Sequence, residues 1–380
     1  MNQNINIEIR KEKEADYLAT EEMCLRAFWN LHGPGCNEHL LVRKLRQHED
    51  YLPELSRIAT VDGKVVAAIM YSKAVIRDGE TEFPVLTFGP LAVDPMYQNT
   101  GFGGKLLTYT MEIAKEEGYP GILIFGEPKY YPKHGFVTAD HFGFTDAQGN
   151  NFDAFMAYEL KEGAFSNRKG KFYESDVFET LSMEEADEMA REFRPILKGN
   201  FPCQWSYENA TQEKDGYHLE PANHYVKEFR SLFNEYIEEL ALYKPWFADK
   251  KDEQGNYLLP VQDEFFTAVE KKAYVIFEKD KAIGITVMSV PNEEELEDGC
   301  ISYIEEMFIE KKSRGKKIAT DIVKRFLRQQ DGNLGFCVLK NNDRAVDIWE
   351  ELIKNEGYRW KRFESEEDTW FYRVEKAISE

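Results

Sequence analysis

The chain has 380 residues, a length that favours two or three domains over one. Hydrophobic residues make up 42% and charged residues 31%, as in an ordinary globular protein, and no run approaches the roughly 18 apolar residues that a membrane helix needs. The net charge of −21 argues against a nucleic-acid surface, which needs a basic patch, and against anionic membranes. It is compatible with a cationic partner such as an amine.

The cysteine count and the N-terminus indicate the compartment. Five cysteines form no CxxC motif, and an odd number in a chain this long is typical of reduced thiols. The stretch MNQNINIEIRKEKEAD has no apolar segment of the kind a signal peptide carries. We therefore expect a cytoplasmic protein, as a monomer or a homodimer.

The first 160 residues alternate between strand and helix patterns. Asp62-Gly63 separates two β-branched runs as a hairpin turn does. We expect strands at 5–9, 56–61, 64–71, 85–93 and 121–125, and helices at 16–28 and from about 106 to a stop at Gly118.

The last 160 residues repeat that order, which predicts a duplicated domain. We expect strands at 217–220, 273–277, 283–290, 300–309 and 334–339, and helices at 225–243 and 318–327. The domains are placed at 1–165 and 216–380. The intervening 166–215 is an extension and connector with a capping-box helix start at Ser182. The acidic run 292–298 is expected to be a solvated hairpin loop.

A glycine-rich stretch, MYQNTGFGGKLL, stands ahead of the first domain's second helix. It is not a Walker A loop, because Gly104-Lys105 is followed by Leu106 and no glycine lies five positions before Gly104. It is not a dinucleotide loop, because the third glycine position holds Leu106. What remains is Gln98-x-x-Gly101-x-Gly103 between a strand and a helix.

This pattern resembles the [QR]xxGx[GA] loop that binds the acetyl-CoA diphosphate in the GNAT superfamily of N-acetyltransferases. Backbone N–H groups and the positive end of the following helix would hold the diphosphate. Pro90 marks a bulge or splayed edge in the preceding strand, and the resemblance implies that pantetheine lies in the gap. The implied cofactor-binding residues are Leu91, Ala92, Val93, Gln98, Asn99, Thr100, Gly101, Phe102, Gly103 and Gly104.

The resemblance continues at GEPKYYPKHGF, where Tyr131 lies 33 residues after Gln98 and is followed by Gly135-Phe136. In the family a tyrosine here protonates the leaving thiolate. A phenol with a pKa of about 10 stays protonated at neutral pH, whereas a thiol has a pKa near 8.5. We assign core packing to Tyr130 and consider Glu127 as a catalytic base.

The second half carries a twin loop, Arg314-x-x-Lys317-x-Ala319, in which a lysine replaces the central glycine. Trp349 holds the tyrosine position, and its indole cannot serve as a proton donor near neutral pH. Glu305 and Glu306 lie where the family often has a general base, whereas the first half has Gly89 and Pro90 there. The candidate cofactor-binding residues are Arg314, Gly315, Lys316, Lys317, Ala319 and Asn342.

The residues His32, Cys36 and His39 match no standard zinc spacing, so we predict no metal and a loop over the substrate cleft. The resemblance implies an α+β chain of two GNAT folds, each a mixed, mostly antiparallel twisted sheet flanked by helices. It implies an N-acetyltransferase with acetyl-CoA as donor and a primary amine, on a small molecule or a peptide, as acceptor. The alternative is a non-catalytic CoA-binding or regulatory protein.

Overall fold

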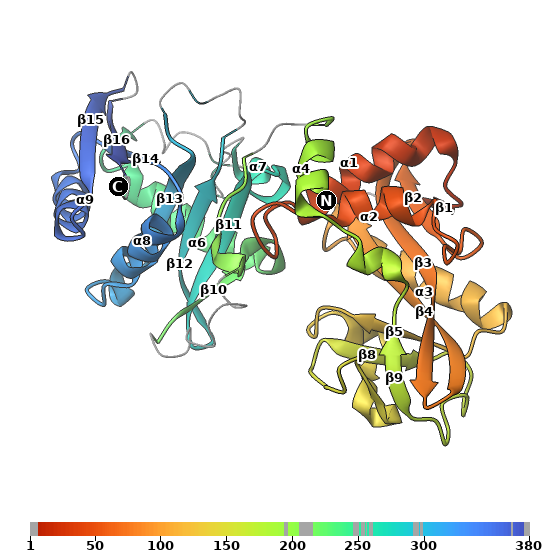
Figure 1. The fold of residues 1–380 in the computed structure, drawn as a ribbon. Helices are drawn as coiled ribbons and strands as arrows, with labels where there is room; N and C mark the ends of the chain where they lie inside the picture. The colour runs from red at the N-terminus through yellow and green to blue at the C-terminus, as the bar shows by residue number, and fades with distance from the viewer. Residues whose placement is uncertain are drawn as a thin grey trace. The chain divides into compact units, whose positions relative to one another are not determined.

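The computed structural model describes residues 7–193, 197–204, 216–245, 251, 255, 257, 261–291, 296, 299–365 and 368–375 (Figure 1). The chain folds as two compact units. One comprises the residues up to Phe28 together with Cys36–Phe193, and the other comprises Trp29–Gly35 together with the chain beyond Phe193.

The first unit is built on a mixed, mostly antiparallel sheet in the order β1-β2-β3-β4-β5-β8-β6, with β9 pairing β3 and β7. Only the β4–β5 and β7–β9 pairs are parallel among the described pairings. The strands are β1 (Ile7–Arg10), β2 (Arg57–Val61), β3 (Lys64–Asp78), β4 (Thr81–Val93), β5 (Gly121–Phe125), β6 (Val137–Thr138), β7 (Phe144–Thr145), β8 (Phe155–Glu159) and β9 (Gly170–Tyr173).

Helices cover both faces of this sheet. The helices are α1 (Tyr17–Phe28), α2 (Glu38–Leu45), α3 (Phe102–Glu116) and α4 (Met183–Ala190). α1 and α2 bury Cys24 and Val42 against Ala68, whereas α3 buries Leu106 in a separate cluster with Leu86. Because successive strand residues point to opposite faces, the two clusters lie on the two sides of the sheet.

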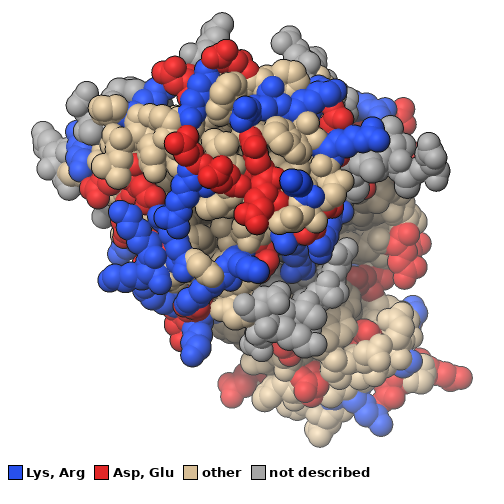
Figure 2. Space-filling view, turned by 90° about the vertical axis from the view of Figure 1, so that its left-hand side faces the viewer, with Lys and Arg blue, Asp and Glu red and all other residues tan. Residues whose placement is uncertain are grey.

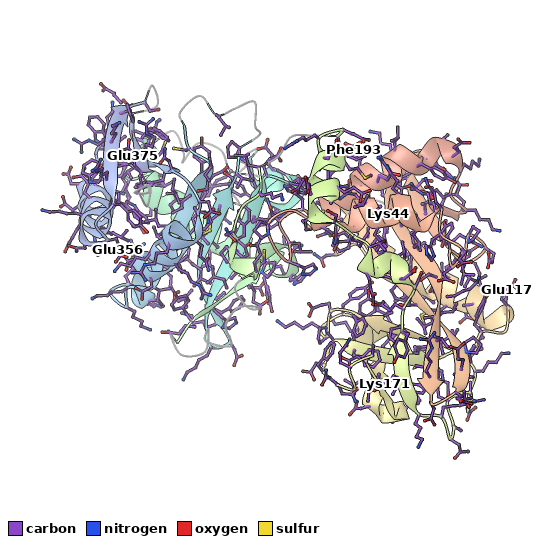
Figure 3. All side chains as sticks on the ribbon, in the orientation of Figure 1. Lys44, Glu117, Lys171, Phe193, Glu356 and Glu375 are labelled. Carbon is purple, nitrogen blue, oxygen red and sulfur yellow. The ribbon has the colours of Figure 1, made fainter. Side chains whose placement is uncertain are left out.

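The first unit continues past residue 165, where the sequence placed the end of the first domain. β9 joins the sheet through buried Phe172, and Met189 of α4 packs against Leu40. Ser182 caps α4, as the capping box predicted. Figure 3 labels Lys171 on β9 and Phe193 at the end of the unit. The buried side chains of Phe172 and Met189 make residues 166–193 part of the first domain. The local sequence pattern did not reveal this burial.

The second unit has a seven-stranded sheet in the order β10-β11-β12-β13-β14-β16-β15, in which only the β13–β14 pair is parallel among the described pairings. The strands are β10 (His218–Pro221), β11 (Lys271–Glu278), β12 (Lys281–Ser289), β13 (Ser302–Ile309), β14 (Leu334–Leu339), β15 (Arg359–Glu364) and β16 (Thr369–Glu375). The helices are α6 (Val226–Leu240), α7 (Val261–Thr267), α8 (Ile318–Gln329) and α9 (Asp343–Asn355).

Charged side chains of both signs are interspersed over the face shown in Figure 2. The second unit contains ion pairs such as Lys361 with Glu375 and Arg328 with Glu356. The acidic run 292–298 lies outside the described residues except for residue 296. Over the described part of the chain, the helices lack the combination of length and apolarity that a bilayer crossing requires.

Candidate functional site

The strand that leads to the first glycine loop carries the predicted irregularity at Pro90. Ile69 of β3 pairs with Leu91, but Tyr71 pairs with Phe88, so two residues of β4 oppose one of β3. On its other side β4 registers with parallel β5 at Leu86, and β4 then runs on to Val93. The bulge and this limited pairing fit a strand that parts from its neighbour.

The loop after β4 has two residues in the left-handed region, Asn99 at φ 60° and Gly101 at φ 86°. Gln98 Nε2 donates a hydrogen bond of 3.1 Å to the Val93 carbonyl, which ties the loop to the end of the strand. Gly101 is the N-cap of α3, and its carbonyl accepts the first helical hydrogen bond, from Lys105 N–H at 3.0 Å. The amides of 102–104 therefore lack partners inside the helix, an arrangement that suits an anion.

Close packing explains two of the glycines. A Cβ on Gly103 would lie 3.0 Å from Tyr130 Oη, and one on Gly104 would lie 2.8 Å from His134 Cε1. The turn that carries Tyr130 and His134 therefore sits directly against the first turn of α3. Tyr130, to which the sequence assigned core packing, places its hydroxyl at this helix terminus.

Tyr131 opens the short 3-10 helix Tyr131–His134 and packs in the cluster on the α3 side of the sheet. Its ring centroid lies 5.9 Å from that of Phe88 and 5.5 Å from that of Phe136. Burial raises the pKa of the Tyr131 phenol well above its ordinary value, so the phenol stays protonated at neutral pH and can donate a proton.

Glu127, the other catalytic candidate of the first half, lies in the same turn. It is exposed, and its Oε1 accepts a hydrogen bond of 3.1 Å from the Lys129 N–H. Its carboxylate thus bonds back to its own turn.

The second loop repeats the first in backbone conformation. Arg314 Nε donates a hydrogen bond of 2.8 Å to the Ile309 carbonyl, as Gln98 Nε2 does to the Val93 carbonyl. Gly315 at φ 84° and Lys317 at φ 64° occupy the two left-handed positions, and Lys317 is the N-cap of α8. The glycine has moved from the fourth loop position to the second, while the fold of the loop is unchanged.

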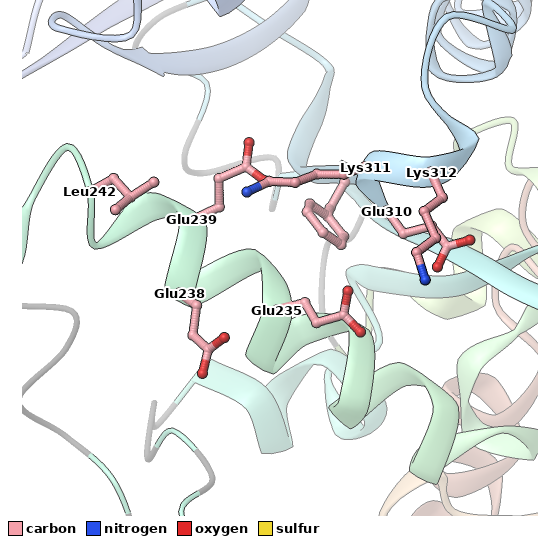
Figure 4. A pocket seen from close by; sticks show the side chains of 8 residues that line it. Glu235, Glu238, Glu239, Leu242, Glu310, Lys311 and Lys312 are labelled. Atoms are coloured by element: carbon pink, nitrogen blue, oxygen red, sulfur yellow. The ribbon is translucent and has the colours of Figure 1, made fainter.

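The cations of the second loop are paired within the fold. Arg314 forms a bidentate ion pair with Glu239 of α6, at 2.9 and 2.6 Å, and Lys316 Nζ lies 2.5 Å from Glu278 Oε1. Glu239 also lines a pocket of about 480 Å³ between α6 and the end of β13 (Figure 4). The pocket is lined by Glu235, Glu238, Glu239, Leu242, Phe308, Glu310, Lys311 and Lys312.

The second domain keeps carboxylates at the bulge. The register of β12 and β13 shifts between Ile304 and Glu306. Burial raises the pKa of Glu306 to about 7, and the Tyr236 hydroxyl donates a hydrogen bond to its carboxylate. Glu305 is 3.0 Å from Lys271 Nζ.

Two further residues of the second half have structural partners. Asn342 Oδ1 accepts a hydrogen bond of 3.2 Å from the Ala345 N–H and so caps α9. The ring of Trp349, at the tyrosine position, packs 5.3 Å from that of Phe336. These contacts account for both residues without a ligand.

Cys36 and His39 are buried, and His39 belongs to α2, whereas His32 of the same predicted loop is exposed. Cys36 Sγ lies 3.6 Å from His39 Nδ1, and His39 Nε2 lies 2.8 Å from the Ala186 carbonyl oxygen. Burial lowers the pKa of His39. Within the described ranges, no group of three or more His, Cys, Asp or Glu side chains could hold a metal ion.

Comparisons with known proteins agree with this architecture. The model of the acetyltransferase (GNAT) domain matches residues 54–138, and that of the acetyltransferase (GNAT) family matches residues 229–352. Together the two segments span just over half of the chain and cover both loops.

Similar proteins include two uncharacterized N-acetyltransferases of Escherichia coli K12. YjhQ is 37% identical over 97 residues, 25% of this chain and 53% of YjhQ, so the match spans about half of that relative. YhbS is 28% identical over 134 residues, 35% of this chain and 78% of YhbS.

Solved structures with a similar fold include YhbS of E. coli in complex with CoA, at 23% identity and a TM-score of 0.43, covering 48% of this chain and 97% of that one. A GNAT acetyltransferase of Brucella melitensis with acetyl-CoA has 24% identity and a TM-score of 0.37, covering 46% and 99%. On the two family matches, the chain belongs to the GNAT superfamily of acetyltransferases and carries two GNAT domains in tandem.

Proposed function

We propose that this protein is an acetyl-CoA-dependent N-acetyltransferase in which the N-terminal domain binds acetyl-CoA and acetylates a primary amine. The observation that carries the proposal is the first loop. Its left-handed Asn99 and Gly101 precede the N-terminus of α3, where the amides of 102–104 have no partner inside the helix. Solved relatives of this superfamily hold CoA or acetyl-CoA.

The donor is held by backbone more than by side chains. The amides of 102–104 and the positive end of α3 bind the diphosphate. Gln98 fixes the loop to the end of β4. The backbone groups of Leu91 and Val93 then lie beyond the bulge, where β4 can pair with the pantetheine amides.

Tyr131 supplies the proton in the proposed reaction. The neutral amine attacks the thioester carbonyl carbon, the carbon–sulfur bond breaks, and the Tyr131 phenol protonates the departing thiolate. The buried phenol is protonated at neutral pH, so its proton is present on Tyr131 when the thiolate forms. Holding the amine beside the thioester supplies most of the remaining acceleration.

The C-terminal domain serves in this proposal to bind the acceptor or complete the fold. Its loop cations Arg314 and Lys316 are already paired with Glu239 and Glu278, so a diphosphate would have to displace internal carboxylates.

The full chain can be tested directly with acetyl-CoA and a panel of small amines and peptide N-termini. We expect acetyl-CoA to raise the melting temperature, and at least one amine to accelerate release of the CoA thiol. The absence of both a melting-temperature shift and calorimetric heat with acetyl-CoA would contradict the proposal.

A further inference from the structure

Two buried hydroxyls lie side by side on the α1–α2 face of the first sheet. Ser72 of β3 pairs with Thr87 of β4, and their side chains are 0% and 1% exposed. Neither hydroxyl has a hydrogen-bond partner among the described residues. A buried polar group without a partner costs free energy, so these two adjacent hydroxyls leave hydrogen-bonding capacity for a polar ligand on this face.

Glu174 directly follows β9, the strand that the sequence did not reveal. Phe172 of β9 pairs with Ile76, and both side chains belong to one buried cluster with Ala74. The pairing of β9 with β3 ends at Tyr173 and Val75, and continuing that register by one residue places Glu174 opposite Ala74. Ser72 is then its diagonal cross-strand neighbour, about 7–8 Å away between Cα atoms and within reach of a glutamate side chain.

The segment that carries Glu174 continues over the bulge of β4. Phe178 packs so closely on Gly89 that a Cβ there would lie 3.0 Å from its ring. At the matching place in the second domain stands Glu305. In the first domain, therefore, Phe178 fills the space at the bulge, and Glu174, four residues earlier, brings a carboxylate to the same face.

We propose that Glu174 binds the ammonium group of the acceptor and takes its proton, with the Ser72 and Thr87 hydroxyls as the polar wall of the acceptor site. This inference rests on the proposed function. The ammonium loses one proton to the Glu174 carboxylate, and the nitrogen lone pair forms the C–N bond. The C–S bond breaks and sulfur takes the Tyr131 proton. The second nitrogen proton leaves as the amide forms and restores the Tyr131 phenol.

In this proposal Tyr131 and Glu174 lie on opposite sides of β4. Thr87 and Phe88 are neighbours and point to opposite faces, and Phe88 packs against Tyr131. Acid and base thus approach the strand from its two sides. Burial, with a smaller contribution from Glu179, raises the pKa of Glu174 to about 7, a value suited to accepting a proton from an amine near neutral pH.

The test uses two unreactive CoA thioethers of equal chain length. S-(2-aminoethyl)-CoA carries an ammonium just beyond the sulfur, and S-propyl-CoA carries a methyl group there. Calorimetry on the full wild-type chain should show at least about tenfold tighter binding of the ammonium compound. Glu174→Gln should abolish that preference while leaving the affinity for S-propyl-CoA unchanged. Glu306→Gln, the same carboxylate-to-amide change made in the other domain, should keep the preference.

The outcomes separate the two proposals. If neither thioether binds, CoA binding itself fails and both proposals fall. If both bind the wild-type chain equally, or if the preference survives in Glu174→Gln, Glu174 is not the acceptor carboxylate while CoA binding stands.

Discussion

The two loops of this protein share a backbone but differ in their charges. Each has left-handed residues at its second and fourth positions, yet the fourth is Gly101 in one domain and Lys317 in the other. The loop conformation therefore does not require the glycine that the family pattern places there. What distinguishes the loops is their side chains, because Arg314 and Lys316 have carboxylate partners whereas the first loop has the uncharged Gln98 and Thr100 at those positions.

The bulges repeat the contrast. Gly89 makes room for Phe178 in the first domain, whereas Glu306 bonds to Tyr236 in the second. The first domain thus fills the bulge with a side chain from an added segment, whereas the second domain keeps carboxylates of the strand itself there. The two halves therefore share a fold but differ in the side chains that occupy the bulge.

The largest effect on kcat should come from changing Tyr131, the proposed proton donor. Tyr131→Phe should lower kcat for amine acetylation by about 100-fold, because a phenyl ring cannot protonate the thiolate. Its affinity for acetyl-CoA should be unchanged. Steady-state kinetics and calorimetry measure the two quantities.

Trp349→Phe is the matched variant of the second domain and should leave kcat within about twofold. If instead Trp349→Phe loses activity and Tyr131→Phe keeps it, chemistry belongs to the C-terminal domain.

A smaller effect concerns stability against pH. The pKa of Glu306 is about 7 in the folded protein, above the ordinary value of about 4.3, so the folded state binds more protons than the unfolded state between these pH values. The free energy of unfolding therefore falls as pH rises through this window. Relative to Glu306→Gln, the wild-type melting temperature should drop by about 5–10 °C from pH 5 to pH 8. A difference that stays constant with pH would refute the raised pKa.

The smallest effect is backbone strain in the second loop. Lys317 has φ 64°, a conformation that glycine adopts without cost. Lys317→Gly should raise the free energy of unfolding by about 0.5 kcal/mol, since relief of strain exceeds the added entropy of the unfolded chain. The neighbouring Lys316→Gly relieves no strain and should destabilise. Denaturant titration distinguishes the two, and equal losses would show that Lys317 is not strained.

Much of the framework was predictable because it is local. The runs 121–125 and 334–339 are strands with those bounds, and the bulge lies where Pro90 predicted it. Strand β9 was missed because four residues carry little periodicity and its pairing with β3 spans about 100 positions. Glu174 lies just beyond this strand and was missed for the same reason, and the sequence offered only Glu127 as a substitute for the base absent at Gly89 and Pro90.

The central claim is that the N-terminal loop alone holds the donor. It is tested most directly by acetyl-CoA calorimetry on the full chain and on two matched variants, Gly103→Val and Ala319→Val. A valine at Gly103 would press on Tyr130 and Val93 and should weaken binding by about 100-fold. Ala319→Val should leave one molecule bound per chain at wild-type affinity. Loss of binding in Ala319→Val with normal binding in Gly103→Val would contradict the account.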